Sequence, residues 1–479
     1  MAVTDKHPRY EALVDTWVQT RDAVAGSAAI KGKGKTYLPV PDSEDEDGKI
    51  VQLASSPRYK SYLKRANYVN FVGRTRSALT GAAFRKDPEY KLPASLEYLV
   101  KDATGSGLPL IQLAKDEVGN NLEVGRGGLL ADYPRVGRVL SKQEEASMGA
   151  RARIIPYTAE SIINWKTVSI NGQIKLSLVV LEESVSVSGD VFSHKTDPQY
   201  RVLRLIDGIY NQEVYNKAGD LESGSTPIAG GKYLTEIPFY FFGSRNNDAS
   251  PDDAPLADMA GNNISHYRNS ADYEESVFLC GQPTLALTSD LSAEQWEKLY
   301  PDGIRLGSRA ALFLGKTGSA NLIQAEPNML AAEAMKAKES NMIQIGARII
   351  TDGNTAETAE GARIRFSSEN SVLADVVGNV SECIEKAISA CALFMRATGE
   401  IEYKISTEFY DKSIDPMIIS ALILLKDRGL VLDEDILARL KESGIVSPDR
   451  TIEDLQDLLD NIDPLSEGGD PDKDQETTE

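Results

Sequence analysis

Two long helical patterns on either side of a short mixed insert constrain this chain most. In the first, "APLADMAGNNISHYRNSADYEESVFL" at 254–279, apolar residues recur mostly at three- and four-residue steps, the spacing of one helix face. A second helix is predicted at 329–347, after the insert. The two helices would form a stalk with a small tip. Because one copy would expose both helices, the pattern predicts a ring of identical subunits that cover one another through a closing head-to-tail interface.

The rest of the sequence predicts an α+β protein with helices at both ends and a sheet-rich module between them. Helices are expected at 7–25, 57–84, 93–104, 107–118, 358–397, 415–428, 433–442 and 451–461. Short β-rich runs separated by Gly, Asn and Asp turns predict about six or seven strands between 122 and 243. Residues 27–53 are expected to form an exposed loop, and Asp253 is expected to cap the first stalk helix.

The insert at 281–328 carries its own alternation of elements. Strands are predicted at "QPTLALT", "AALFLG" and "ANLIQAE". The segment "SAEQWEKLY" predicts a helix with Ser292 as its cap. Trp296 in this helix is expected either to belong to a core or to anchor a partner.

Two Gly-Lys-Thr triplets, at 34–36 and 315–317, raise the question of a phosphate-binding loop. Such a loop has the pattern G-x-x-x-x-G-K-[ST], with a first glycine five positions before the second. At that first position this chain has Ala29 and Ala310 instead of glycine. Neither triplet is followed by a sequence that predicts a helix. A nucleotide-hydrolysing site is therefore not predicted, and the lysines at 31–35 are assigned to a solvated loop.

No other motif predicts catalysis, and the chain is not expected to be an enzyme. His7, His194 and His266 lie far apart, and H-E-x-x-H, C-x-x-C and G-x-S-x-G are absent from the sequence. No catalytic residue, metal site or cofactor is predicted. His266 is expected to be a packing or interface residue, and the acidic residues at 272–275 a solvated or ring-interface face.

Composition and charge indicate in which compartment the chain is expected and how it would interact with membranes and DNA. No apolar run is long enough to span a bilayer, and the N-terminus has no apolar signal core. The three cysteines suit a reducing compartment, with Cys383 and Cys391 expected in the core. With 72 acidic and 52 basic residues the chain carries a net charge of −20, which is unfavourable for tight binding to DNA phosphates.

Long parts of the sequence resemble the portal proteins of tailed bacteriophages. The resemblance rests on "PLADMAGNNISHYRNSADYEESVFLCGQPTLALT" and "IGARIITDGNTAETAEGARIRFSSENSVLADV". The N-terminal runs "HPRYEALVDTWVQTRDAVAG" and "YKSYLKRANYVNFVGRTRSALTGAAFRKDP" are similar to one portal-like subfamily. These are not catalytic signatures, and their specificity comes from their order and extent.

The resemblance implies a division of the chain into the parts of a portal subunit. These are a wing at 1–253, a first stem helix at 254–280, a clip at 281–328, a second stem helix at 329–348, a tunnel loop at 349–357, a long wing helix and return at 358–409, crown helices at 410–465 and a disordered acidic tail at 466–479.

The resemblance also implies partners and a location. Twelve subunits would form a ring at one capsid vertex of the virion, after assembly in the host cytoplasm. Double-stranded DNA would pass through the ring without sequence recognition. The terminase large subunit, neck or adaptor and tail proteins, the major capsid protein and scaffolding protein would be partners. No membrane contact is implied.

Candidate site residues follow from these parts. The DNA channel would be lined by Thr351, Asp352, Gly353, Asn354, Thr355, Lys336, Lys338 and Arg348, and the clip would dock its partner through Gln295, Trp296 and Lys298. The charge of −20 per subunit predicts a mostly acidic channel that repels the duplex. Lys336 and Lys338 could instead pair with acidic residues at 272–275 of a neighbouring subunit, and 351–355 could be an ordinary turn.

Two other functions remain open at this point. One is another ring-forming component of a phage neck, although such chains are usually much shorter. The other is an enzyme with a site hidden in the sheet-rich module. A ring with an axial hole wide enough for double-stranded DNA would distinguish a portal from an enzyme.

Overall fold

The computed structural model describes most of the chain up to residue 409. The described residues are 2–40, 57–134, 150–170, 172–187, 192, 194–281, 284–304, 312–324, 329–350, 371–409, 432, 434, 436, 437 and 451. Contacts divide the chain into two units, Met1–Thr407 and Glu408–Glu479. All elements described below belong to the first unit. The predicted tunnel loop from residue 351 onward, nearly all of the predicted crown and the acidic tail lie outside the described residues.

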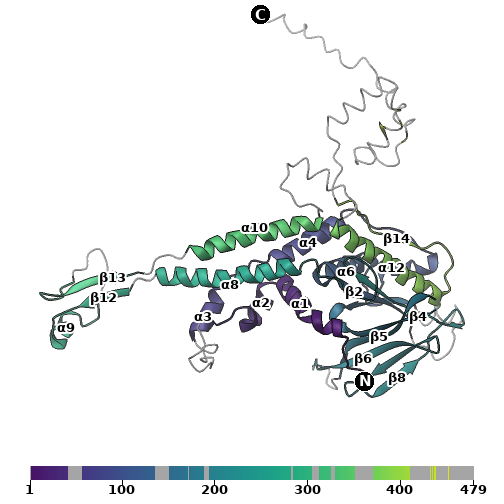
Figure 1. The fold of residues 1–479 in the computed structure, drawn as a ribbon, viewed down its shortest axis with the longest axis horizontal. Helices are drawn as coiled ribbons and strands as arrows, with labels where there is room; N and C mark the ends of the chain where they lie inside the picture. Colours follow the sequence, from purple (N-terminus) through teal and green to yellow (C-terminus); the bar gives the residue numbers. More distant parts are fainter. Residues whose placement is uncertain are drawn as a thin grey trace, which may run out of the picture. The chain divides into compact units, whose positions relative to one another are not determined.

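The fold is α+β, as the sequence predicts (Figure 1). The helices are α1 Pro8–Ala25, α2 Ser27–Gly32, α3 Pro57–Arg65, α4 Phe71–Ala83, α5 Tyr98–Lys101, α6 Leu110–Val124, α8 Ala257–Cys280, α9 Ala293–Leu299, α10 Leu330–Ile350 and α12 Val372–Met395, with 3-10 turns η1 Gly34–Thr36, η3 Ala94–Leu96 and η4 Ala159–Ser161. The strands are β1 Glu89–Lys91, β2 Arg126–Asp132, β3 Arg153–Thr158, β4 Ile162–Ile170, β5 Gln173–Ser186, β6 Thr196–Ile206, β7 Ile209–Tyr215, β8 Leu221–Ser225, β9 Ile228–Ala229, β10 Lys232–Tyr233, β11 Phe239–Gly243, β12 Thr284–Thr288, β13 Ser319–Ile323 and β14 Glu402–Lys404.

The sheet-rich module is confirmed and ends at Gly243, as expected, but its described part has ten strands rather than six or seven. Strands β4 to β8 form an antiparallel meander in chain order, and β11, β2 and β3 form a second sheet with β2 in the centre. The second sheet cannot be recognised from local patterns, because β11 pairs with β2 across more than a hundred residues, with Phe239 opposite Leu130.

Two adjacent glycines explain how the central strand β2 packs. A Cβ atom on Gly127 would lie 2.1 Å from Cζ of Phe242, and one on Gly128 would lie 2.2 Å from Cζ of Phe239. Any larger residue would displace these rings, so glycine is required for the close approach of β11. Phe239 then joins a core shared by both sheets and by Tyr10 and Trp17 of α1.

Helix α12 packs against β2, β11 and α6, and it is the core helix of the module. Ser371 caps it by accepting a hydrogen bond from the backbone N–H of Ala374 at 3.1 Å. The expectation that Cys383 and Cys391 are core residues is confirmed, since both are fully buried. Burial raises the pKa of both thiols, which keeps them protonated and unreactive.

The N-terminal helices differ from the sequence prediction in three places. The helix predicted at 93–104 is only the turn η3 followed by the four-residue helix α5. The helix predicted at 57–84 is two helices, α3 and α4, because Asn70 caps α4 by accepting from the N–H of Gly73 at 2.7 Å. Residues 27–36 are not a loop. They form α2 and η1, and Ile30 and Leu38 are buried in a core with tyrosines of α3 and with α8. Burial of these apolar residues outweighs the loop-like composition of the segment.

Two further predictions were wrong, one about the start of the first stalk helix and one about a strand of the insert. Asp253 does not cap α8. Its carbonyl accepts a hydrogen bond from Ser244 at 2.8 Å and its carboxylate pairs with Arg245. The strand expected at "AALFLG" is not formed by its described residues, 312–315. The other three elements of the insert are confirmed as β12, α9 and β13.

Candidate interaction surface on a two-helix arm

Helices α8 and α10 lie side by side and form what we call the arm (Figure 1). Residues late in α10 lie beside residues early in α8: a Cβ on Gly346 would lie 3.2 Å from the methyl group of Met259. Nearer the middle, Lys338 Nζ donates to the carbonyl oxygen of Ser265 at 3.3 Å. The helices are therefore antiparallel, and the insert joins their far ends.

His266 lies between the two helices of the arm. Its side chain is 1% exposed, and its Nε2 lies 3.2 Å from Oε1 of Glu339 on α10. The ring of Phe71 on α4 contacts the imidazole edge-on. The prediction that His266 is a packing residue is confirmed, and it links α8 to both α10 and α4.

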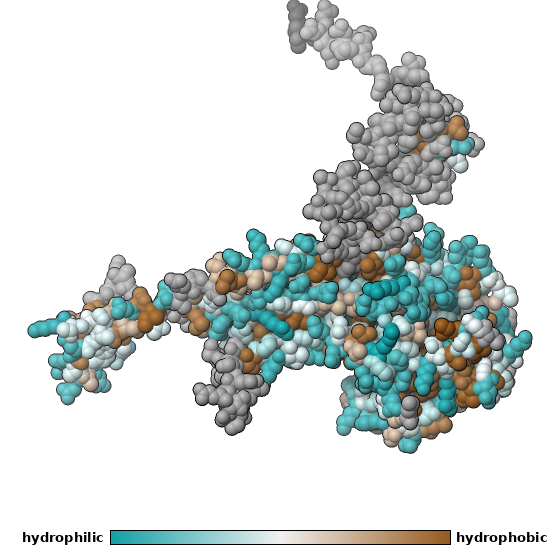
Figure 2. Space-filling view, in the orientation of Figure 1, coloured by the Kyte–Doolittle hydropathy of each residue, from teal (hydrophilic) through white to brown (hydrophobic). Residues whose placement is uncertain are grey.

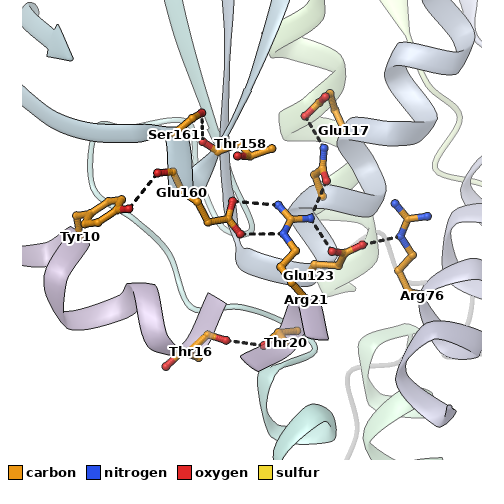
Figure 3. Close-up of polar contacts among 11 residues, drawn as sticks. Tyr10, Thr16, Thr20, Arg21, Arg76, Glu117, Glu123, Thr158, Glu160 and Ser161 are labelled. Atoms are coloured by element: carbon orange, nitrogen blue, oxygen red, sulfur yellow. Dashed lines mark hydrogen bonds and ion pairs between the residues drawn. The ribbon is translucent and has the colours of Figure 1, made fainter. Parts of the chain in front are cut away.

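A charged network surrounds the root of the arm, where α1 and α4 contact α8 (Figure 3). Arg21 on α1 donates from Nη1 to Oε2 of Glu123 at 2.5 Å and from Nε to Oε1 of Glu160 at 2.9 Å. Arg76 on α4 forms an ion pair with the other oxygen of Glu123 at 2.9 Å. Burial alone would raise the pKa of Glu160, but the hydrogen bond and charge of Arg21 outweigh it and hold this pKa below its usual value. The network thus joins α1, α4, α6 and η4.

Glu117 is the third carboxylate beside these two arginines. It is 3% exposed and accepts a hydrogen bond from Nδ2 of Asn120 at 3.2 Å, while Oδ1 of Asn120 accepts from Arg21 at 2.8 Å. Burial raises the pKa of Glu117 to about 7, and the opposing effect of the Asn120 hydrogen bond is smaller. The pKa values of Glu117 and Glu160 are thus shifted in opposite directions, and Glu117 is the one that burial favours in its protonated form.

The distal half of the arm exposes large apolar side chains. At the end of α8, Val277, Phe278 and Leu279 are 50%, 42% and 52% exposed, and Met329 and Leu330 at the start of α10 are 61% and 74% exposed. Apolar side chains gather where the arm meets the tip (Figure 2). Contiguous exposed apolar surface marks an interaction site in a folded protein. The sequence places Phe278 on the apolar stripe of this helix, but it does not indicate that the end of the stripe is exposed.

Helix α3 braces one side of the arm. Tyr62 donates to Oδ1 of Asp272 at 2.6 Å, and Arg65 pairs with Glu275 while its guanidinium lies over the ring of Phe278. Burial, followed by the hydrogen bond to Asp272, raises the pKa of Tyr62. The expectation of a solvated or ring-interface acidic face at 272–275 is therefore wrong for Glu275, which pairs with Arg65 and is 17% exposed, whereas Asp272 is exposed and accepts a hydrogen bond from Tyr62.

The insert forms a tip built on the antiparallel pair β12 and β13. Ser292 and Gln295 form a reciprocal capping box at the start of α9, with Oε1 of Gln295 accepting from the N–H of Ser292 at 3.0 Å. Trp296 is half-buried, and its ring lies 5.0 Å from that of Tyr300. The described part of the tip thus places Trp296 between the two expected environments, neither in a core nor fully exposed.

The second Gly-Lys-Thr triplet binds a carboxylate of the tip itself. Oδ2 of Asp290 accepts hydrogen bonds from the backbone N–H groups of Lys316 and Thr317 at 3.1 and 3.3 Å. Gly315 has φ +92°, and a Cβ there would collide with the same carboxylate. Successive backbone N–H groups in such a turn favour an anion, and Asp290 already occupies them. This agrees with the rejection of a phosphate-binding loop.

The predicted site residues differ in where the structure places them. Lys336 and Lys298 are exposed, Lys338 is directed to the Ser265 carbonyl, and Gln295 is engaged in the helix cap. Burial, followed by the charge of Arg268, lowers the pKa of Lys338. The backbone of Arg348 lies in the last turn of α10. Thr351, Asp352, Gly353, Asn354 and Thr355 lie outside the described residues, so their role stays a prediction.

The described residues also bear on metal sites and on membrane spans. Nowhere in the described part of the chain do three or more His, Cys, Asp or Glu residues come together as they would to hold a metal ion. None of the described helices is both long and apolar enough to cross a membrane.

Comparison with known proteins places the arm and tip within one family model. Residues 255–395, from just before α8 to the last residue of α12, match the family described as "Domain of unknown function (DUF4055)". No curated protein matches the chain.

Two solved structures of gene transfer agent particles have chains similar to this one. One is from the "Virion of native gene transfer agent (GTA) particle", with 14% identity, 83% of this chain and 94% of that chain covered, and a TM-score of 0.42. The other is from the "Neck of empty GTA particle computed with C6 symmetry", with 15% identity, 80% and 94% covered, and a TM-score of 0.45. At these values the likeness is distant, and it assigns no function to this chain.

Proposed function

We propose that this chain is a portal subunit, which forms a ring at one vertex of a phage-type capsid and a channel for the packaging and ejection of double-stranded DNA. The observation that carries the proposal is the exposed apolar end of the arm. The resemblance of the arm sequence to portal stem helices supports it. Under this proposal the arm is the stem, the tip is the clip and the sheet-rich module belongs to the wing.

The physical case for a ring is the large apolar surface that the described part of the distal arm exposes. Five large apolar side chains there, Val277, Phe278, Leu279, Met329 and Leu330, are each more than two-fifths exposed. Covering them with the arm of an identical neighbour removes this surface from water, at about 25 cal/mol for each Å² buried. A head-to-tail contact of this kind gives a ring when the rotation between neighbours closes after a whole number of copies.

The proposed channel is a conduit that does not bind DNA tightly. Each lysine in contact with a phosphate adds affinity that depends on salt and would slow the passage of the duplex. A net charge of −20 on every subunit gives the ring an acidic field that opposes such contacts. Lys336, Lys338 and Arg348, with the loop 351–355, are proposed as the channel-lining residues.

The tip is the proposed docking site for the terminase large subunit and for neck or adaptor proteins. It carries exposed groups that suit a protein partner, namely Lys298 on α9 and the half-buried ring of Trp296. Aromatic side chains with one exposed face are enriched among the residues that dominate protein interfaces. The major capsid and scaffolding proteins are proposed partners of the rest of the ring.

Charging the apolar end of the arm is expected to abolish the ring. In the double variant Leu279→Glu, Leu330→Glu, two carboxylates would have to be buried between neighbouring copies without partners. We expect a native mass of one subunit, with the circular dichroism of the wild type. The control is Leu221→Glu on β8, whose side chain is similarly exposed at 58%, and it should leave the mass unchanged. A double variant that assembles like the wild type contradicts the role given to the arm.

A further inference from the structure

The helices beside the arm form a strongly basic segment of an otherwise acidic chain. Residues 57–86, which span α3 and α4, include eight lysines and arginines and no aspartate or glutamate, in a chain of net charge −20. An acid-free stretch of this length is a local electrostatic feature that the net charge conceals.

Three lysines of this region lie on neighbouring elements. Lys60 and Lys64 are one helical turn apart on α3, both exposed, and therefore on one side of that helix. Lys31 on α2 reaches the same place, since its Nζ donates to the carbonyl oxygen of Lys64 at 3.2 Å. We call Lys31, Lys60 and Lys64 the basic face. Within the described part of the chain, no carboxylate pairs with any of the three.

The basic face is held rigidly to the distal arm. A buried core of Ile30, Leu38, Tyr59 and Tyr62 joins α2 and α3 to each other and to α8. Arg65, next to Lys64, pairs with Glu275 and covers one side of the Phe278 ring. The end of α3 that carries Lys64 therefore lies beside the exposed ring of Phe278 on α8.

We propose that the basic face binds an acidic surface of the neighbouring copy of this chain, and so supplies the electrostatic part of the ring interface. The proposal rests on the proposed function, because it needs the ring. Copies that each carry a charge of −20 repel one another, so a head-to-tail contact needs a surface of the opposite sign on one of its two sides. The basic face has that sign and adjoins the apolar surface that a neighbour would cover.

A DNA duplex is the other polyanion that such lysines could bind. The observations favour the neighbouring copy. The surrounding acidic field opposes the approach of a duplex, whereas the apolar end of the arm draws a second copy to this side. Rim charges of an interface act mainly by orienting the partner and by excluding wrong arrangements.

The test reverses the charge of the basic face in the full-length chain. Assembly is measured as the protein concentration at which half of the chain is in rings, by native mass and light scattering. For Lys60→Glu, Lys64→Glu we expect this concentration to rise at least about tenfold, because each attraction becomes a repulsion. The matched control is Lys166→Glu, Lys195→Glu, which makes the same charge change at two exposed lysines of the sheet-rich module and should shift assembly by less than about twofold.

Several results of this experiment would contradict the proposal. Equal assembly of the two double variants overturns the proposal. So does a Lys60→Glu, Lys64→Glu variant that assembles normally but loses retention of double-stranded DNA at low salt, which would assign the basic face to nucleic acid. If the charge-reversed variant does not fold, Lys60→Gln, Lys64→Gln provides the same comparison. A wild-type chain that never assembles contradicts the proposed function itself, and is seen before any variant is made.

Discussion

Glu117→Gln should stabilise the protein above pH 7 by up to about 3 kcal/mol and should remove the loss of stability that the wild-type carboxyl group causes between pH 4.5 and 7. In the folded state burial raises the pKa of Glu117 from 4.5 to about 7. The folded protein therefore keeps a proton that the unfolded chain releases in this pH range. Consequently the contribution of Glu117 to the free energy of unfolding falls as the pH rises from 4.5 to 7 and is level above that. A glutamine has no proton to lose and keeps an oxygen that can accept from Asn120.

Urea unfolding at pH 5 and at pH 8, followed by the fluorescence of the buried Trp17 and Trp165, measures this effect. The neighbouring carboxylate Asp116 gives a graded comparison, since it lies on the same helix and its charge makes a smaller contribution than burial to the raised pKa of Glu117. Asp116→Asn should therefore weaken the pH dependence less than Glu117→Gln does. If Glu117→Gln and the wild type lose stability equally between pH 5 and pH 8, the account of Glu117 as the proton-holding group of the network is wrong.

Glu123→Gln, six residues further along the same helix, should have the opposite effect and destabilise the protein by about 2–3 kcal/mol at pH 7. Glu123 is nearly buried and pairs with both Arg21 and Arg76. Its replacement would leave the half-buried Arg76 without its carboxylate and reduce the partners of Arg21 to Glu160 and Asn120. The expected loss is smaller than for a fully buried pair because the two arginines are 24% and 27% exposed.

The same urea experiment measures this second change at pH 7. The exposed pair of Lys91 and Glu402 serves for comparison, and Glu402→Gln should leave the unfolding midpoint unchanged because solvent screens exposed ion pairs. Hydrogen exchange should also become faster in α1 and α4 of Glu123→Gln, since the network joins these helices to α6. Wild-type stability together with unchanged exchange would show that the network does not hold the root of the arm.

Local patterns predicted the arm and most of the tip, because helical periodicity and helix caps depend only on residues that are close together in the sequence. The stripe of α8 and the Ser292 cap are examples, and both are confirmed. The break between α3 and α4 was missed because its signal is the single Asn70, within a segment that is otherwise helical in pattern. The helix α2 was not predicted because the lysines and glycines of this segment are typical of a loop. The helix is stabilised by the burial of one residue, Ile30.

The candidate site was less accessible to sequence reasoning, since it depends on contacts between distant segments. Glu117 falls in a predicted helix, but nothing adjacent to it indicates that α1 and α4 bring two arginines close. The sequence predicts a solvated or ring-interface acidic face at 272–275 and gives no sign of the partners of Asp272 and Glu275, because Tyr62 and Arg65 lie 210 residues earlier. The basic face was hidden by the acidic balance of the whole chain, which averages over the acid-free stretch at 57–86.

The most direct test of the proposed function is the assembly of the purified wild-type chain, measured by native mass and imaged by negative-stain electron microscopy at several salt concentrations. The account predicts closed rings of about twelve subunits with an axial hole wide enough for double-stranded DNA, and arms that contact one another around it. A monomer or dimer at micromolar concentration under all these conditions would contradict it.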